Sequence, residues 1–102
     1  MKIIRNNVRY VTSMSSNTNT GTKRLSDLAL GIQALVSHVD EFSPADRIAA
    51  RLRDLGFVAG EPVRIVATGP VGGDPLLVQV GFTRFALRHG EASRVMVQFA
   101  DR

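Results

Sequence analysis

The chain has two histidines, and each has acidic residues close by in the sequence, a pattern that could bind a metal ion. His38 is followed by Asp40 and Glu41. His89 is followed by Glu91. Imidazole and carboxylate groups together suit a borderline divalent ion such as Fe²⁺ or Zn²⁺. Each cluster supplies only one imidazole, fewer than a three-ligand site usually needs. We therefore predict no obligatory metal or cofactor, and we expect an added ion to bind weakly at these clusters.

No catalytic constellation accompanies the histidines. The glycine-rich segment 69–73 lacks the Gly-Lys-Ser/Thr that follows in a phosphate-binding P-loop, and it lies between two predicted strands. The chain has no cysteine, which excludes disulfides, thiolate catalysis and cysteine-based zinc sites. The sequence therefore predicts a protein that is not an enzyme, with a plain hairpin loop at 69–73.

Charge is unevenly distributed along the 102 residues, although the net charge is +4. Residues 1–24 carry five Lys or Arg and no acid, whereas residues 25–102 carry eight Arg and nine acids. A nucleic-acid-binding domain usually concentrates basic charge on its folded surface, so we expect no nucleic-acid partner. Residues 1–23 are predicted to form a flexible basic and polar tail, because their Ser, Thr and Asn cannot bury a core. Residues 24–102 are predicted to form one small domain.

The sequence also indicates whether a segment could span a membrane or direct export. It contains no run of about 18 apolar residues, the length that a spanning helix needs. The first residues carry charge but no apolar stretch behind it, unlike a signal peptide. We therefore expect a cytoplasmic protein that reaches a membrane only through a partner.

One amphipathic helix is predicted at 44–55. Ser43 suits the N-cap and Pro44 the first helical position. Gly56 fits the left-handed conformation just past a helix, and Phe57 can then fold back onto the helix. The predicted apolar stripe consists of Ala45, Ile48, Ala49, Leu52 and Leu55.

The other elements are short strands with an apolar residue at every second position. We predict strands at 33–39, 63–68, 76–80, 84–88 and 95–99. In the first, Leu35 and Val39 should share one face, and Ala34 and Val36 the other. With the single helix inserted after this first strand, the elements predict a mainly β fold, a small five-stranded SH3-like barrel whose closure limits exposed edges.

Three motifs occur in a fixed order along this domain. The first runs Arg51-Leu52-Arg53-Asp54-Leu55-Gly56-Phe57 and continues to Gly60, the second is Gly73-Asp74-Pro75-Leu76, and the third is Ala86-Leu87-Arg88 followed by Glu91-Ala92. Together they resemble the bacterial ferrous-iron transport protein A (FeoA) family over residues 25–99. Several motif residues are expected to serve the fold, namely Gly56, Phe57, Gly60, Asp74, Pro75 and Leu87.

The resemblance implies a function. Members of this family are small cytoplasmic companions of the membrane transporter FeoB, which carries a GTP-binding domain and imports ferrous iron. The resemblance thus implies a non-enzymatic accessory or regulatory protein that docks on the cytoplasmic part of that transporter. Two alternatives stay open. One is a free-standing small barrel that binds RNA through its basic tail. The other is a metal-responsive regulatory domain, because the same barrel occurs in iron-dependent metalloregulators.

Five residues are predicted to bind the partner because they have the least folding rationale. Arg47 and Arg51 lie four apart on the polar helix face, where like charges cost a few tenths of a kcal/mol. Leu77, Ala86 and Met96 should point outward from the strands and form a docking patch. A solvated helix face, or cover by another element, would explain them equally well. Weak self-association is a further expectation.

Overall fold

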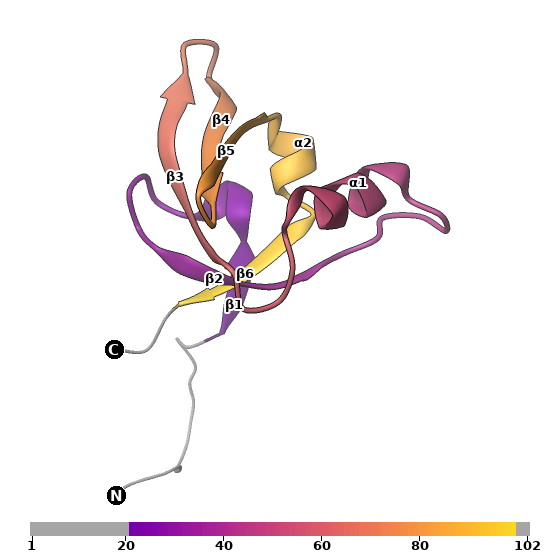
Figure 1. Ribbon diagram of the computed structural model, residues 1–102. Coiled ribbons are helices and arrows are strands. Elements are labelled where there is room, and N and C mark those ends of the chain that lie inside the picture. The colour runs from indigo at the N-terminus through magenta and orange to yellow at the C-terminus, as the bar shows by residue number, and fades with distance from the viewer. Residues whose placement is uncertain (1–20, 100–102) are drawn as a thin grey trace, which may run out of the picture.

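The structure, a computed structural model, describes residues 21–99 and consists mainly of antiparallel strands (Figure 1). Its sheet has the strand order β1-β6-β2-β3-β4-β5. The helices α1 and α2 lie next to each other on one side of this curved sheet (Figure 1). The elements in chain order are β1 (Thr22–Arg24), the 3₁₀ turn η2 (Leu25–Asp27), β2 (Ala34–Val39), α1 (Arg47–Leu55), β3 (Pro62–Gly69), β4 (Gly73–Val80), β5 (Thr83–Leu87), α2 (His89–Ala92) and β6 (Val95–Phe99).

The predicted mainly β fold, with its principal helix between the first two long strands, is confirmed. The structure adds two short elements. Strand β1 pairs with β6 and uses Thr22 and Lys23, which the sequence placed in the tail. Helix α2 lies in the segment between the predicted strands 84–88 and 95–99, for which no helix was predicted. Both elements span only three or four residues, too few for a periodic pattern to develop. The rest of the predicted tail, 1–20, lies outside the described residues.

The core lies between the curved sheet and α1. Phe57 is 1% exposed, and its ring packs against that of Phe85 with the centroids 6.2 Å apart. Leu87 is also buried, at the end of β5. The strands contribute mostly β-branched side chains, which suit a pleated sheet with one buried face. The buried strand residues are Ala34, Val36, Val39, Val63, Ile65, Leu76, Val78, Val80, Leu87, Val95 and Val97.

A β-bulge changes the predicted faces of β2. Ala34, Val36 and Val39 are all buried, so the expectation that Val39 shares a face with Leu35 is wrong. The pairing of β2 with β6 shifts between Val36 and His38, which leaves Ser37 as an extra residue. One extra residue reverses the alternation beyond it. Val39 therefore returns to the core and His38 faces solvent.

Helix α1 begins later than predicted. Its N-cap is Asp46, whose side chain accepts hydrogen bonds from the backbone N–H groups of Ile48 and Ala49 at 3.0 and 3.2 Å. The predicted start at Ser43 and Pro44 is wrong, because Ala45, just before the cap, has a φ of 57° and interrupts the helical path. The helix ends as predicted, at Gly56 with a φ of 115°.

Candidate functional site

A pocket of about 550 Å³ opens between α1, the loop joining β3 to β4, the end of β5 and α2. We call it the arginine pocket, because Arg51 and Arg88 line it from different elements. Its other lining residues are Val71, Asp74, Pro75, Ala86 and Glu91. The pocket thus brings together Arg51 and Ala86, two members of the predicted docking patch that are distant in sequence.

The two carboxylates of the arginine pocket already have partners. Asp74 Oδ1 accepts hydrogen bonds from the backbone N–H and from Nδ1 of His89, both at 2.9 Å. The side-chain hydrogen bond from His89 is the main reason that the pKa of Asp74 lies below its usual value. Glu91 accepts the backbone N–H of Arg88 at 2.9 Å, and its other oxygen lies 3.9 Å from Arg51.

The arginines of this region are less well satisfied. Arg51 is 71% exposed, and its 3.9 Å contact with Glu91 is too long for a hydrogen bond. Within residues 21–99, neither Arg88 nor Arg47 forms an ion pair. The pocket therefore presents Arg88, which has no ion pair in the described residues, and Arg51, which Glu91 holds only at 3.9 Å. Both guanidinium groups can meet an anionic group on another molecule.

The strand residues of the predicted docking patch lie in two separate places. Leu77 on β4 and Ala86 on β5 are opposite each other in the register. Met96 lies on β6, opposite Arg24 and His38, and in the sheet order β2 and β3 separate β6 from β4. Leu77 and Met96 are both half-buried, whereas Ala86 is exposed. Arg47 lies one helical turn before Arg51.

The structure pairs the predicted metal-ligating residues differently from the sequence pattern. His38 Nε2 lies 2.9 Å from Asp40 Oδ1, as their spacing suggested, but Glu41 bonds to Arg53 instead. His89 contacts Asp74 across the fold and not Glu91 nearby. Within the part of the chain that the structure describes, no group of three or more His, Asp or Glu side chains is placed to share a metal ion. Two separate imidazole–carboxylate pairs are the result.

A buried ion pair was missed by sequence reasoning. The Asp46 side chain is 4% exposed, and its Oδ2 accepts a hydrogen bond from Arg94 Nε at 2.8 Å. The same carboxylate accepts the backbone N–H of Phe42 at 2.9 Å. These bonds, the one from Arg94 above all, hold the pKa of Asp46 well below its usual range. The Arg94 guanidinium also stacks 4.3 Å from the centroid of the Phe42 ring. The pair fixes the start of α1 against the start of β6.

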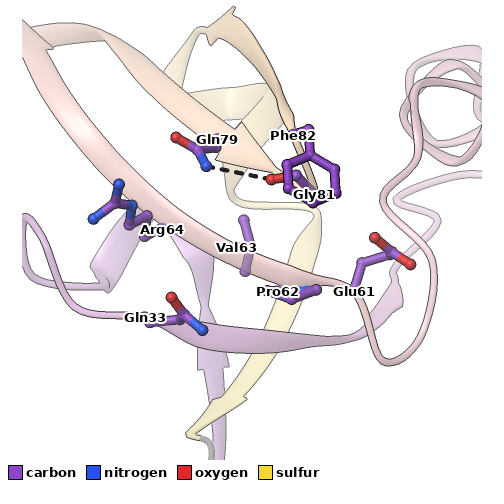
Figure 2. Close-up of a pocket in the computed structure, with 8 residues that line it drawn as sticks. All are labelled: Gln33, Glu61, Pro62, Val63, Arg64, Gln79, Gly81 and Phe82. Carbon is purple, nitrogen blue, oxygen red and sulfur yellow. Dashed lines mark hydrogen bonds between the residues drawn. The ribbon is translucent and has the colours of Figure 1, made fainter.

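A second pocket, of about 310 Å³, lies at the end of the β4–β5 hairpin (Figure 2). Phe82 is fully exposed at the hairpin turn, beside the hydrogen bond from Gln79 Nε2 to the carbonyl of Gly81 at 3.3 Å. The polar side chains of this pocket are two amides, one carboxylate and one guanidinium. They provide no nucleophile paired with a base, so this pocket suggests binding and not covalent chemistry.

The described helices are all short. Among residues 21–99, none is long and apolar enough to cross a membrane.

Comparison with known proteins identifies related sequences and folds. The FeoA domain family matches the chain over residues 23–99. The crystal structure of FeoA from Stenotrophomonas maltophilia, complexed with zinc, is 63% identical, with a TM-score of 0.69, and the match covers 74% of this chain and 88% of that one. That protein is described as a procaryotic SH3 domain protein and put forward as an activating factor of bacterial ferrous iron transport.

Two further structures extend the comparison. FeoA from Chlorobium tepidum is 33% identical with a TM-score of 0.64, and the match covers 76% of this chain and 70% of that one. A manganese-dependent transcriptional repressor is 17% identical with a TM-score of 0.66, over 81% of this chain and 44% of that one, a likeness of fold alone. No curated protein matches the chain. The SH3-like fold expected from the sequence is confirmed.

Proposed function

The chain belongs to the FeoA family, and we propose that it docks on the cytoplasmic part of a FeoB-type, GTP-dependent ferrous iron transporter. The family match supports the role of a small accessory protein in ferrous iron transport. In this proposal the protein is cytoplasmic, carries out no chemistry of its own, and reaches the membrane only through its partner. The docking surface lies on the outer face of the barrel.

The arginine pocket is the observation that carries the docking proposal. It gathers exposed positive charge from α1 and the end of β5 beside the apolar side chains of Val71, Pro75 and Ala86. Such a combination is typical of a protein-binding surface, in which arginine is enriched and apolar contacts supply much of the affinity. We place the contact at Arg47, Arg51 and Ala86, with Leu77 beside Ala86 and with Met96 as a more distant member.

Metal binding has a minor part in this proposal. A relative was solved with zinc, and the present chain has the His38–Asp40 and His89–Asp74 pairs on its surface. A single imidazole and one carboxylate supply too few ligands for tight tetrahedral zinc. We propose weak binding of Zn²⁺ or Fe²⁺ at either pair, without a role in folding.

Co-purification with the cognate FeoB-type transporter tests the docking proposal. The tagged full-length protein should retain the transporter, and so should a form lacking 1–20, because the arginine pocket is intact in both. Charge changes at the surface, Ala86→Glu and Leu77→Glu, should reduce retention and ferrous iron uptake while the Tm stays nearly unchanged. Met96→Glu tests the distant member in the same way.

A matched control separates docking from a general effect of charge. Arg64→Glu changes the net charge as Arg51→Glu does, but Arg64 lines the second pocket. Arg51→Glu should reduce retention and Arg64→Glu should not. Loss of retention on removing 1–20, together with salt-sensitive RNA binding, would favour the alternative of an RNA-binding module. Normal iron uptake after deletion of the gene would contradict the iron-transport function itself.

A further inference from the structure

We infer that the free edge of β5, together with the arginine pocket, binds an extended acidic segment of the partner protein as an added strand. This inference rests on the proposed docking function and specifies the chemistry of the docked segment. Strand addition is a common mode of peptide recognition, in which main-chain hydrogen bonds give affinity and side-chain pockets give specificity.

The first argument is the open edge of β5. This strand is last in the sheet order and, among the described residues, pairs only with β4. Val80 and Thr83 are opposite each other across a two-residue turn, so Thr83 bonds to β4, and so does every second residue after it. Arg84 and Ala86 then direct their backbone N–H and C=O groups away from β4. Within residues 21–99, no further backbone hydrogen bond reaches Arg84 or Ala86.

The second argument is the continuity of this edge with the pocket. The side chains of Arg84 and Ala86 are exposed, whereas Leu87 points into the core. Ala86 lines the arginine pocket at the end of the strand, next to Pro75. A strand laid along β5 would therefore place one of its side chains over the pocket. The pocket volume of about 550 Å³ is ample for an aspartate or glutamate side chain.

Charge identifies the occupant. Arg51 and Arg88 line the pocket and Arg84 lies on the edge itself. Within residues 21–99, the Arg84 side chain bonds only to the neutral Gln79, at 3.3 Å. The carboxylates of Asp74 and Glu91 are engaged by His89 and by the Arg88 backbone. An added strand that carries Asp or Glu would meet these guanidinium groups and form charge-assisted hydrogen bonds.

Two other occupants fit less well on charge. Residues 1–20 of the same chain carry Lys2, Arg5 and Arg9 and no acid, so they would be repelled by the arginines. A second copy pairing through its own β5 would bring another Arg84 to the same edge, and like charges close together in a sheet are destabilising. An acidic segment of a partner is thus the occupant that the structure favours.

Peptide binding to the isolated full-length protein tests the inference. The probe is a short, acetylated peptide of alternating valine and glutamate, followed by ¹⁵N amide shifts and amide hydrogen exchange. The amides of Arg84 and Ala86 should shift and exchange more slowly on binding, because they gain main-chain partners. A peptide with lysine in place of glutamate should bind much more weakly, and added salt should weaken binding of the acidic peptide.

Variants separate the contribution of the edge from that of the charges. Ala86→Pro removes the N–H group from the open edge, a position at which a strand tolerates proline, whereas Ala86→Val keeps it. The first should lose binding and the second should keep it, at similar Tm. Arg88→Glu should weaken binding by about tenfold, the loss typical of one charge-assisted hydrogen bond. Arg64→Glu is the matched charge control and should leave binding unchanged.

Several results would overturn the inference. The inference would be wrong if the acidic peptide did not bind, or if it shifted mainly the residues of the second pocket. It would also be wrong if the lysine peptide, or a peptide with a methylated backbone nitrogen, bound equally well. Shifts at Arg84 and Ala86 that depend on protein concentration alone would show that a second copy is the occupant. Co-purification of the transporter without peptide binding would remove this inference and leave the docking function intact. Peptide binding without co-purification would support strand addition at β5 and contradict the docking function.

Discussion

The Asp46 carboxylate joins three backbone N–H groups and one guanidinium at a single buried point. The N–H groups belong to Phe42, Ile48 and Ala49, and the guanidinium belongs to Arg94, just before β6. Half of these bonds cap α1, and the others tie the preceding loop and β6 to it. Removing one member of such a pair leaves the other buried without its partner, which is more costly than losing an exposed pair.

This arrangement predicts how Asp46→Asn responds to pH. The folded state lowers the pKa of Asp46 from its ordinary value of 3.8. The ionised group therefore stabilises the fold above about pH 4, and this stabilisation is lost as pH falls through the lower, folded value. Asp46→Asn should be clearly less stable than the wild type at pH 7, and the difference should narrow as the pH falls below about 4.

Thermal unfolding between pH 7 and pH 2 measures this difference. Asp54→Asn is the matched control, because Asp54 lies exposed on the same helix and forms no ion pair with any other residue in the range 21–99. The control should follow the wild type at every pH. A constant gap between Asp46→Asn and the wild type over the whole range would contradict the proposed role of the charge.

At the scale of the elements, Gly56 at the end of α1 and Gly90 in α2 offer a matched pair of glycine substitutions. Gly56 has a φ of 115°, whereas Gly90 in α2 has no positive φ, and a Cβ atom added at either would meet no other part of residues 21–99 within 4 Å. The two sites thus differ in backbone conformation and not in space. Gly56→Ala should lower the free energy of unfolding by about 1–2 kcal/mol, the cost of a left-handed L-residue.

The same change at Gly90 should be neutral, or stabilising by up to about 1 kcal/mol, because alanine suits a helix better than glycine. Urea unfolding of the two variants provides the measurement. Equal losses at both positions would contradict the positive φ as the reason for glycine at the end of α1.

The elements also show which structural features a sequence can predict. The end of α1 at Gly56 and the alternation in β4 and β5 are local signals, and both were recognised. In β3 a register shift between Ile65 and Ala67 interrupts the alternation, and Ala67 is exposed. The N-cap at Asp46 was missed because its partner Arg94 lies 48 residues away and because Ser43-Pro44 formed a plausible earlier cap. The bulge at Ser37 depends on the pairing with β6, which no local pattern encodes. The contact of His89 with Asp74 likewise arises from the fold, across 15 residues.

The candidate site was predictable only in part for the same reason. Arg51 and Ala86 had little folding rationale, which singled them out individually. Their meeting in one pocket depends on how α1, α2 and the end of β5 come together, and Arg88 joins them only there. Met96 shared the outward pattern of Leu77, but the sheet order separates their strands. Alternation predicts the face of a side chain but not its neighbours across the sheet.

For the whole molecule, the order of the sheet determines where a partner strand can add. Strands β1 and β5 are at its two ends, and β1 has only three residues, all paired with β6. Strand β5 is longer, and its open side leads directly into the arginine pocket. Proteins usually protect such an edge with charge or with a covering element. The exposed Arg84 on β5 is compatible with both protection against self-pairing and attraction of an acidic segment.

The whole molecule also determines what removal of a metal should do. The core consists of apolar side chains from every strand except β1, and the two imidazole–carboxylate pairs lie outside it, with His38 at the end of β2 and His89 on α2. Since neither pair joins elements of the core through three or more ligands, no metal is expected to support the fold. A chelator should therefore leave the Tm unchanged, and excess Zn²⁺ should raise it only slightly.

Zinc titration followed by ¹⁵N shifts places the weak sites. His38→Ala should abolish the shifts near the end of β2 and keep those near α2, and His89→Ala should do the opposite. Unfolding by the chelator would mean that a metal supports the fold. Loss of both sets of shifts in either variant would mean that the two pairs belong to one metal site.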